Sequence, residues 1–497
     1  MRKILTTLVP NALFILSVVF VILLAKGWQF DFQDGTIVKT GILDIHSQPK
    51  GATIALDGKE SGLTPQKVTG LKPQRYQLTL TKDHYQPWQK NIVTYPELAT
   101  QVYDVILFAT SPVIERQNLP EFSRIAESDS PQRIVVLSPS APDPTSSLVS
   151  VYSTRFDLLY QSLLPIDLSS TSIRALWSPD LNSCILNFEN STTASPTLNS
   201  SFFFSIKNPS TPPLSLLSLS FFSSDPSSLQ SPLWAQDNSS LIYNRNSQIL
   251  TINLRDQTEH LVISEARGFL PLFSAPASGF FQKPRLYYLK PRTGTSVYDL
   301  WYQELPDGNG GQITTSHPFS DVVSLTISQD YNNIFLADQT ASTILINISS
   351  QSPGERTAPR LINKPLSWSP DGERFLFVSE DGQIAYYDQL KDTFLYPYSP
   401  KEGEQLDFAC WHPDSLHIFF QTTLTTENQT RHQISAIEYD GKNLTTLFDD
   451  RADFPDIESL HAQIPILAPD TKSLILSSII ERRTGSPLLF LYTLRYD

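Results

Sequence analysis

The chain has 497 residues, of which 40% are hydrophobic and 18% are charged. This composition excludes a largely disordered chain, and the length predicts more than one domain. Residues 1–110 carry 11 Lys and Arg against 8 Asp and Glu, whereas the rest of the chain carries 26 against 42. An acidic bulk argues against nucleic acid as a partner, because phosphates bind basic surfaces.

Residues 4–25 form an uncharged, apolar segment directly after the basic pair Arg2-Lys3. Its length is sufficient for a helix that spans the hydrocarbon core of a bilayer. The basic pair predicts a cytoplasmic N-terminus, with everything after Lys26 outside the cell. A cleaved signal peptide is the alternative, but Leu23-Leu24-Ala25 offers only one of the small residues that cleavage favours. We therefore expect a single-pass protein of the cell membrane, with an uncleaved anchor at 4–25, a juxtamembrane linker at 26–40 and an extracytoplasmic bulk.

Short alternating runs between turn signals follow the linker and predict a small β-sandwich at 41–110. Asp57-Gly58 favours a tight hairpin, because such a turn needs positive φ at its centre. Thr64-Pro65 and Lys72-Pro73 mark further turns. The runs that read as strands are "GILDIHS", "ATIAL", "RYQLTLTK", "WQKNIVT" and "QVYDVILF".

The same stretch resembles the PEGA domain, a surface module of bacteria and archaea. The resemblance rests on the order of "PKGA" at 49–52, "LDGK" at 56–59, "GLKPQRYQLTL" at 70–80 and "HYQPWQKNIVT" at 84–94. Lys50 replaces the acidic residue of the family's name motif, and Gln74 and His84 stand where the family usually has glycine. The resemblance implies an extracytoplasmic β module and carries no chemistry.

A short motif recurs through the rest of the chain, at 113–497. "WSPD" occurs at 177–180 and 368–371, with "WHPD" at 411–414 and "WAQD" at 234–237. Further candidate copies are "ISQD" at 327–330, "LAPD" at 467–470, "LSPS" at 137–140 and "FSAP" at 273–276. Most copies precede an apolar run such as "RFLFVS" or "HIFFQ". The positions that we expect to be structural are Trp177, Asp180, Trp234, Asp237, Trp368, Asp371, Trp411, Asp414 and Asp470.

A repeat of 39 to 57 residues with several short strands in each unit predicts a β-propeller, here with seven or eight blades. In "WSPDGERFLFVSEDG", Trp368 ends the first strand of a blade and fills the space beside the neighbouring blade. Pro370, Asp371 and Gly372 then turn the chain, because Pro presets φ, Asp bonds its own backbone and Gly accepts positive φ. The stretch therefore predicts a turn between strands rather than an active site.

The repeat resembles the propellers of the periplasmic TolB protein of the Tol-Pal system and of related WD-repeat-like families. "LWYQELPDGNGGQITTS" at 300–316 and "ISAIEYDGKNLTTLF" at 434–448 have the strand, turn, strand form of those blades. The resemblance covers roughly 113–497. The chain ends in an apparent third strand, so we expect residues near 113–136 to supply the missing strand and close the ring.

Two Ser- and Pro-rich stretches within 190–233 interrupt the repeat, and their composition predicts long loops within one blade. They could instead form a surface binding feature, although a mobile loop is the interpretation that we prefer.

Known catalytic motifs are missing from the sequence, which has no HExxH, GxSxG or P-loop. The separation of His412 and His417 argues against a zinc pair. Asp449, Asp450, Asp453 and Asp456 are weak candidates for calcium ligands, but they lack the glycine and ligand order of a known loop. Cys184 and Cys410 are expected to be free buried thiols. We predict no cofactor, no metal and no catalytic residue.

The sequence thus predicts an all-β protein whose function is binding or scaffolding in a prokaryotic cell envelope. The propeller would present a surface for an envelope protein, a peptide or a glycan. The alternative is an extracytoplasmic hydrolase that uses paired carboxylates in the propeller channel. A converging set of carboxylates there would support the alternative, and a channel lined by Ser, Thr and apolar groups would count against it.

Overall fold

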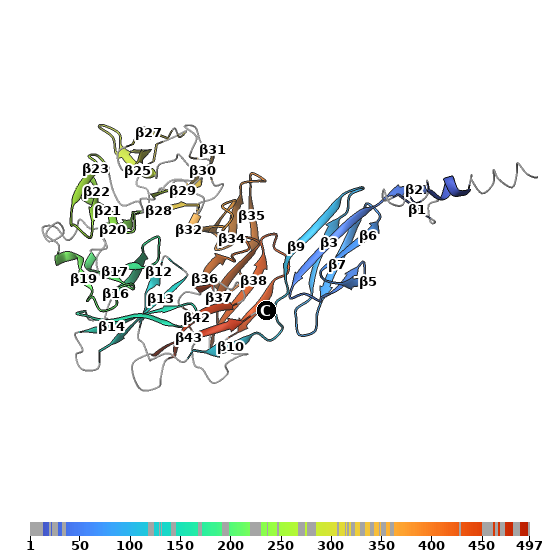
Figure 1. The fold of residues 1–497 in the computed structure, drawn as a ribbon, viewed down its shortest axis with the longest axis horizontal. Helices are drawn as coiled ribbons and strands as arrows, with labels where there is room; N and C mark the ends of the chain where they lie inside the picture. Colours follow the sequence, from blue (N-terminus) through green and yellow to red (C-terminus); the bar gives the residue numbers. More distant parts are fainter. Residues whose placement is uncertain are drawn as a thin grey trace, which may run out of the picture. The chain divides into compact units, whose positions relative to one another are not determined.

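The architecture comes from a computed structural model and is almost entirely β-sheet (Figure 1). The structure describes residues 13–18, 21, 28–31, 36–117 and most of 124–495. Within the last range the description omits 129, 131, 141–145, 167–170, 191–197, 219–229, 236, 246–247, 267–273, 276–284, 306–307, 314, 316–317, 320–323, 329–332, 338–341, 347, 349–353, 358–361, 427–428, 450–460, 463–465, 468–472 and 481–487.

The expected anchor at 4–25 lies mostly outside the described residues. Residues 13–18 are helical, and β1 (Trp28–Asp31) pairs antiparallel with β2 (Thr36–Lys39) in the expected linker. A search of the described residues finds no helix with the length and apolar character that crossing a bilayer requires.

The module after the linker is a sandwich of two sheets. One sheet has the order β6-β3-β9 and the other β5-β4-β7-β8. Their inner faces share one core, in which Leu43, Ile54, Leu78 and Trp88 are at most 4% exposed. The strands are β3 (Gly41–Gln48), β4 (Thr53–Leu56), β5 (Lys59–Leu63), β6 (Gln66–Leu71), β7 (Arg75–Thr81), β8 (Trp88–Val93) and β9 (Ala99–Ile106).

Local sequence explains the hairpins of this module. Asp57 and Gly58 both have positive φ, at 49° and 79°, as a two-residue hairpin between β4 and β5 requires. His84 also has positive φ, 68°, at the position where a glycine was the expected residue. The five strands that alternation predicts are present, whereas β5 and β6 were not predicted, because few apolar residues alternate in them.

Residues 113–441 and 448–495 belong to a second compact unit. Its described residues form eight successive sheets, which we number first to eighth in chain order. The first sheet consists of β11 (Arg124–Ile125), β13 (Arg133–Pro139), β14 (Ser147–Ser153) and β15 (Leu158–Leu164), and the second of β12 (Glu127–Ser128), β16 (Thr171–Trp177), β17 (Ser183–Asn190), β18 (Leu198–Ser205) and β19 (Leu214–Ser215). The third sheet consists of β20 (Gln230–Trp234), β21 (Ser240–Arg245), β22 (Gln248–Asn253) and β23 (Glu259–Ile263), and the fourth of β24 (Ser274–Ala275), β25 (Arg285–Pro291), β26 (Tyr298–Glu304) and β27 (Gly310–Gln312).

The fifth, sixth and seventh sheets each contain four strands that lie side by side in chain order, and the eighth combines strands from both ends of the unit. They consist of β28 (Ser324–Ile327), β29 (Asn333–Ala337), β30 (Ser342–Ile346) and β31 (Gly354–Thr357); β32 (Ile362–Trp368), β33 (Arg374–Ser379), β34 (Ile384–Asp388) and β35 (Thr393–Tyr398); β36 (Glu404–Trp411), β37 (His417–Thr426), β38 (Gln429–Glu438) and β39 (Thr445–Asp449); and β40 (His461–Ala462), β41 (Ile466–Leu467), β42 (Ser473–Ile480), β43 (Leu488–Arg495) and β10 (Val113–Arg116). A single 3-10 turn, η1 (Leu216–Ser218), follows β19.

The eighth sheet joins the two ends of this unit. Strand β10 comes from its start, and it pairs antiparallel with β43 from its end, with Val113 opposite Arg495 (Figure 1). The sequence placed the closing strand within 113–136, and β10 lies there. Pairing between the ends removes the two open sheet edges that an unclosed propeller would expose.

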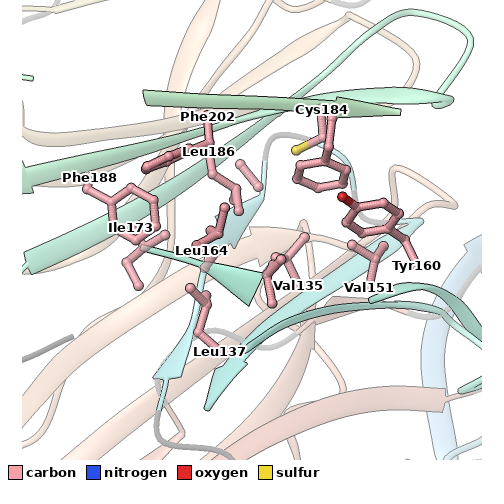
Figure 2. Packing of buried hydrophobic residues seen from close by; sticks show 14 of the residues in the cluster. Val135, Leu137, Val151, Tyr160, Leu164, Ile173, Cys184, Leu186, Phe188 and Phe202 are labelled. Carbon is pink, nitrogen blue, oxygen red and sulfur yellow. The ribbon is translucent and has the colours of Figure 1, made fainter. Parts of the chain in front are cut away.

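Alternate side chains of one strand pack against opposite neighbouring sheets. In β17, Leu186 packs against the first sheet, whereas Ile185 packs against the third. In β33, Phe375 packs towards the fifth sheet and Leu376 towards the seventh. Both faces of β17 and of β33 are therefore buried, which explains why these strands read as continuous apolar runs. Figure 2 shows the junction of the first two sheets, where Val135 and Tyr160 meet Cys184 and Phe202.

Two sequence expectations need correction in this unit. "LSPS" is not a copy of the motif, because Leu137, Ser138 and Pro139 lie in β13, the second strand of its sheet. The stretch 190–233 is not only loop, because it contains β18 and β19. Phe202, Phe203 and Phe204 follow one another in β18 between Ser residues and pack between sheets, so Ser content alone misled the prediction.

Candidate functional site

The motif tryptophans lie at equivalent places between sheets. Trp234, Trp368 and Trp411 end the first strand of their sheets, and Trp177 ends β16, which follows the two-residue β12 in its sheet. Each tryptophan packs towards the preceding sheet. Trp177, Trp234, Trp368 and Trp411 are 4%, 8%, 6% and 5% exposed. The indole of Trp234 also donates from Nε1 to the carbonyl of Leu176 in the preceding sheet, at 3.0 Å. These residues hold neighbouring sheets together.

The motif aspartates organise the turn that follows each tryptophan. Asp180 Oδ1 accepts from Ser178 Oγ at 2.7 Å, and Asp371 accepts from Ser369 Oγ in the same way. Asp237 Oδ1 accepts from the backbone N–H groups of Ser239 and Ser240, at 2.9 and 2.8 Å. The carboxylates therefore satisfy turn N–H groups that would otherwise lack partners. Asp470 lies outside the described residues.

Neighbouring turns are also bonded to one another. The backbone N–H of Asp180 donates to Asn238 Oδ1 at 2.9 Å, and that of Asp371 donates to Ser415 Oγ at 3.0 Å. Asn238 and Ser415 occupy the same motif position, one residue after the aspartate, and both have positive φ, 58° and 61°. One residue of each such turn thus reaches back to the turn of the sheet before it.

A pocket of about 580 Å³ opens where the turns of the second and third sheets meet. Such a volume is in the range of small-ligand sites. Its walls come from the motif turn of each sheet and from the segment between β18 and β19. The lining residues are Asp180, Asn182, Ser183, Phe203, Phe204, Ser205, Lys207, Asn208, Thr211, Pro212, Pro213, Leu214, Trp234, Asn238, Ser239, Leu254 and Arg255.

The apolar part of the pocket is aromatic. Phe203 and Trp234 lie with ring centroids 6.0 Å apart, and Leu214 packs against the same cluster. Pro212 and Pro213 extend this wall. Aromatic and proline surfaces are typical of sites that receive an apolar group. The Ser- and Pro-rich segment that the sequence left as a loop or a binding feature therefore contributes directly to the pocket.

The charged part of the pocket combines one carboxylate with two cations. Burial acts to raise the pKa of Asp180, but hydrogen bonds from Ser178 and Asn182, with Lys207 nearby, lower it to about 2. Lys207 Nζ lies 3.5 Å from Asp180 Oδ2, so these two charges offset one another. Arg255 is exposed and forms no ion pair with any residue that the structure describes. Among the described residues, the rim therefore offers one positive charge, that of Arg255, outside any ion pair.

A second polar cluster lies in the turn between β36 and β37. His417 Nδ1 lies 2.6 Å and His412 Nδ1 lies 3.1 Å from Asp414 Oδ2. Burial acts to raise the pKa of Asp414, but the hydrogen bonds from both imidazoles hold it well below its usual value. The separation that argued against a zinc pair does not keep these rings apart, because the turn folds the chain back on itself.

Of the four weak calcium candidates, Asp449 lies among the described residues. Asp449 is 6% exposed and forms an ion pair with Arg431, and Gln433 Nε2 donates to its Oδ2 at 2.8 Å. Asp450, Asp453 and Asp456 lie outside the described residues. Cys184 is buried and Cys410 is half-buried, and neither forms a disulfide with a described residue. Desolvation raises the pKa of the Cys410 thiol to about 12, so this thiol stays protonated at neutral pH.

Comparison with known proteins identifies the family of the first module, whereas the solved structures similar to the chain have low TM-scores. Residues 40–106 match the family described as the PEGA domain, so this part of the chain is a PEGA domain. Among solved structures, a eukaryotic initiation factor is 14% identical and covers 78% of this chain and 93% of its own, with a TM-score of 0.48. The C-terminal WD40 domain of Sif2 is 10% identical and covers 77% and 99%, with a TM-score of 0.46.

The WD40 domain of SCAP from fission yeast is 12% identical, covers 78% of this chain and 98% of its own, and has a TM-score of 0.43. Structural similarities with such low TM-scores carry no argument, so the propeller assignment rests on the sheet order of this chain. The chain consists of a PEGA domain followed by a β-propeller. No curated protein matches the chain.

Proposed function

We propose that the propeller is a binding scaffold, and that the pocket between its second and third sheets receives an apolar side chain of a partner protein with a carboxylate beside it. The observation behind this proposal is the pairing of an aromatic wall, Phe203 and Trp234, with the exposed cation Arg255, which forms no ion pair with a described residue. The apolar wall favours desolvation of a hydrophobic group, and the guanidinium favours a carboxylate. The role proposed is binding rather than catalysis.

The proposal commits to a peptide segment of a protein because turns of two neighbouring sheets line the pocket. A protruding segment of a partner can enter such a site while the rest of the partner contacts the surrounding turns. Lys207 and Asn208 stand at the rim and can donate hydrogen bonds to the backbone carbonyls of that segment.

A selection from a random peptide phage library on the purified, detergent-solubilised full chain tests the proposal. We expect enrichment of peptides in which an aromatic or aliphatic residue lies next to Asp or Glu. Arg255→Glu should weaken the binding of the selected peptides at least about tenfold, because it replaces electrostatic attraction of their carboxylates by repulsion. Arg155→Glu, which changes an exposed cation in the turn between β14 and β15, should leave binding unchanged. No enrichment, or equal binding by Arg255→Glu, would contradict the proposal.

The cellular setting is a separate part of the proposal. We propose that residues 4–25 anchor the protein in the cell membrane, with Arg2 and Lys3 inside and the PEGA domain and propeller outside. The apolar character of this segment and the basic pair before it support this topology. The PEGA domain would then act as a spacer or contact the cell wall.

Protease treatment of intact cells that carry a C-terminal epitope tag tests the topology. Loss of the tag, while internal proteins stay intact, is the expected result. A tag that is cleaved only after lysis would place the propeller inside the cell and contradict the topology.

A further inference from the structure

The turn between β36 and β37 carries two imidazoles that its geometry does not require. In the second sheet the same two positions are Ser178 and Ser183, and the turn aspartate accepts from the Ser178 hydroxyl. In the sixth sheet they are Ser369 and Arg374, and a hydroxyl and a guanidinium donate to the aspartate. The seventh sheet has His412 and His417 instead. The Asx turn is therefore satisfied in other sheets without any histidine.

The two imidazoles aim the same ring atom at one carboxylate oxygen. Nδ1 of His412 and Nδ1 of His417 lie 3.1 and 2.6 Å from Oδ2 of Asp414, and the three ligand atoms lie within 4.8 Å of one another. The rings are perpendicular, at 90°, with centroids 6.1 Å apart. Both histidine side chains are almost fully buried, at 1% and 3% exposed. Three atoms that can each ligate a metal thus converge inside the protein.

The second carboxylate oxygen of Asp414, Oδ1, fixes the orientation of the carboxylate. Asp414 Oδ1 accepts from the backbone N–H groups of Leu416 and His417, at 2.8 and 3.0 Å. Oδ2 is therefore held towards the imidazoles. The backbone N–H of Asp414 also points at His412 Nδ1, 3.4 Å away, so this ring nitrogen lies close to both the backbone and the carboxylate of Asp414.

We propose that His412, Asp414 and His417 bind one divalent transition-metal ion of the zinc class. Zinc binds imidazole nitrogen and carboxylate oxygen at about 2.0–2.2 Å with tetrahedral geometry, which places neighbouring ligand atoms roughly 3.3 Å apart. The His412 contact already has nearly this spacing, and the His417 contact needs to open by less than about 1 Å. Asp414 is 15% exposed, so water can reach the fourth position.

The site would tie the first and second strands of the seventh sheet together at the turn where they meet. Because His412 ends one side of the turn and His417 begins β37, an ion held by both would resist separation of the two strands. The expected role is structural, and the ion should raise the stability of the folded chain by binding only to it.

Metal titration of the untagged, detergent-solubilised full chain after treatment with EDTA tests the proposal. We expect one tightly bound Zn²⁺ per chain in competition with a chromophoric chelator, and a visible d–d absorption band with Co²⁺. Zn²⁺ should also raise the melting temperature. His412→Ser and His417→Ser, which introduce residues that the second sheet carries at these positions, should each weaken binding at least about tenfold. His46→Gln, at an exposed histidine beside Asp44 in the PEGA domain, should leave the stoichiometry unchanged.

Absence of a stoichiometric ion from the wild-type chain, or equal binding by the His412→Ser and His417→Ser double variant, would overturn the proposal. If that variant does not fold, X-ray absorption of the zinc-loaded wild-type chain decides the question. Two imidazole nitrogens around the ion would support the site, whereas one or none would overturn it.

Discussion

Ser415 bonds the turn of its own sheet to the turn of the sheet before it. Its Oγ accepts from the backbone N–H of Asp371 at 3.0 Å, and its carbonyl accepts from the guanidinium of Arg374 at 3.3 Å. Asn238 and Asp180 repeat the first of these bonds between the second and third sheets. A single position after the motif aspartate therefore connects successive blades as well as turning the chain.

Ser415→Ala should lower the free energy of unfolding by about 1 kcal/mol, because the N–H of Asp371 loses its acceptor at a part-buried site. The bond from Arg374 reaches the carbonyl and should persist. Urea denaturation measures the change. Ser61→Ala, at an exposed hydroxyl in the PEGA domain, is the control and should change stability by less than about 0.5 kcal/mol.

Trp368→Ala should lower the free energy of unfolding by about 3–5 kcal/mol, which is more than we expect for Ser415→Ala. Trp368 lies beside Phe375, which stacks on Phe335 of the fifth sheet at 4.3 Å, so a cavity would open between two sheets. Leu390→Ala removes a side chain that is 71% exposed and should be nearly neutral. Equal effects of the two substitutions in urea denaturation would show that the tryptophan does not hold the sheets together.

Replacement of β10, residues 113–116, by Gly-Ser-Gly-Ser should lower the melting temperature of the propeller. The variant leaves β43 with an unpaired edge, so association that depends on concentration is also expected. The same replacement of β2, residues 36–39, lies outside the propeller and should leave its transition unchanged. Scanning calorimetry with light scattering measures both effects, and an unchanged transition in the first variant would contradict closure through β10.

The ionised carboxylate of Asp180 should stabilise the folded chain at neutral pH and should lose this effect in acid. Its pKa in the folded chain is about 2, below the ordinary value of 3.8, so its hydrogen bonds stabilise the fold at neutral pH. That contribution should be lost as the pH falls from about 4 to 2, when the carboxylate is protonated. Asp180→Asn should therefore be less stable than wild type at pH 7 and more nearly equal to it at pH 2.5, as urea midpoints at the two pH values would measure. A difference that stays constant with pH would contradict this role.

Much of the architecture is predictable because its signals are local. Asp57-Gly58 and Gly372 mark turns whose positive φ the structure contains, and the apolar runs "RFLFVS" and "HIFFQ" become β33 and the start of β37. Strand β18 escaped prediction because Ser flanks its three consecutive Phe residues on both sides, and Ser content favoured a loop. The structure shows that the Phe side chains nevertheless pack between sheets.

The candidate pocket was beyond sequence analysis for a different reason. Phe203, Trp234 and Arg255 belong to turns and strands of two sheets, and nothing in their local sequences indicates that they meet. A Pro-rich segment after an aromatic run was the only local signal, and it suited a binding feature as well as a loop. His412 and His417 illustrate the same limit, because the fold of the turn decides where their ring nitrogens point.

A photo-crosslinking experiment in intact cells tests the central claim, that the pocket binds a partner protein, most directly. Benzoylphenylalanine is placed at Asn208 on the pocket rim, and in a second strain at Leu390, which is exposed in another sheet. The account predicts a discrete crosslinked protein from position 208 that is absent from position 390 and disappears when Arg255→Glu is added. No crosslink from position 208, or the same product from both positions, would contradict it.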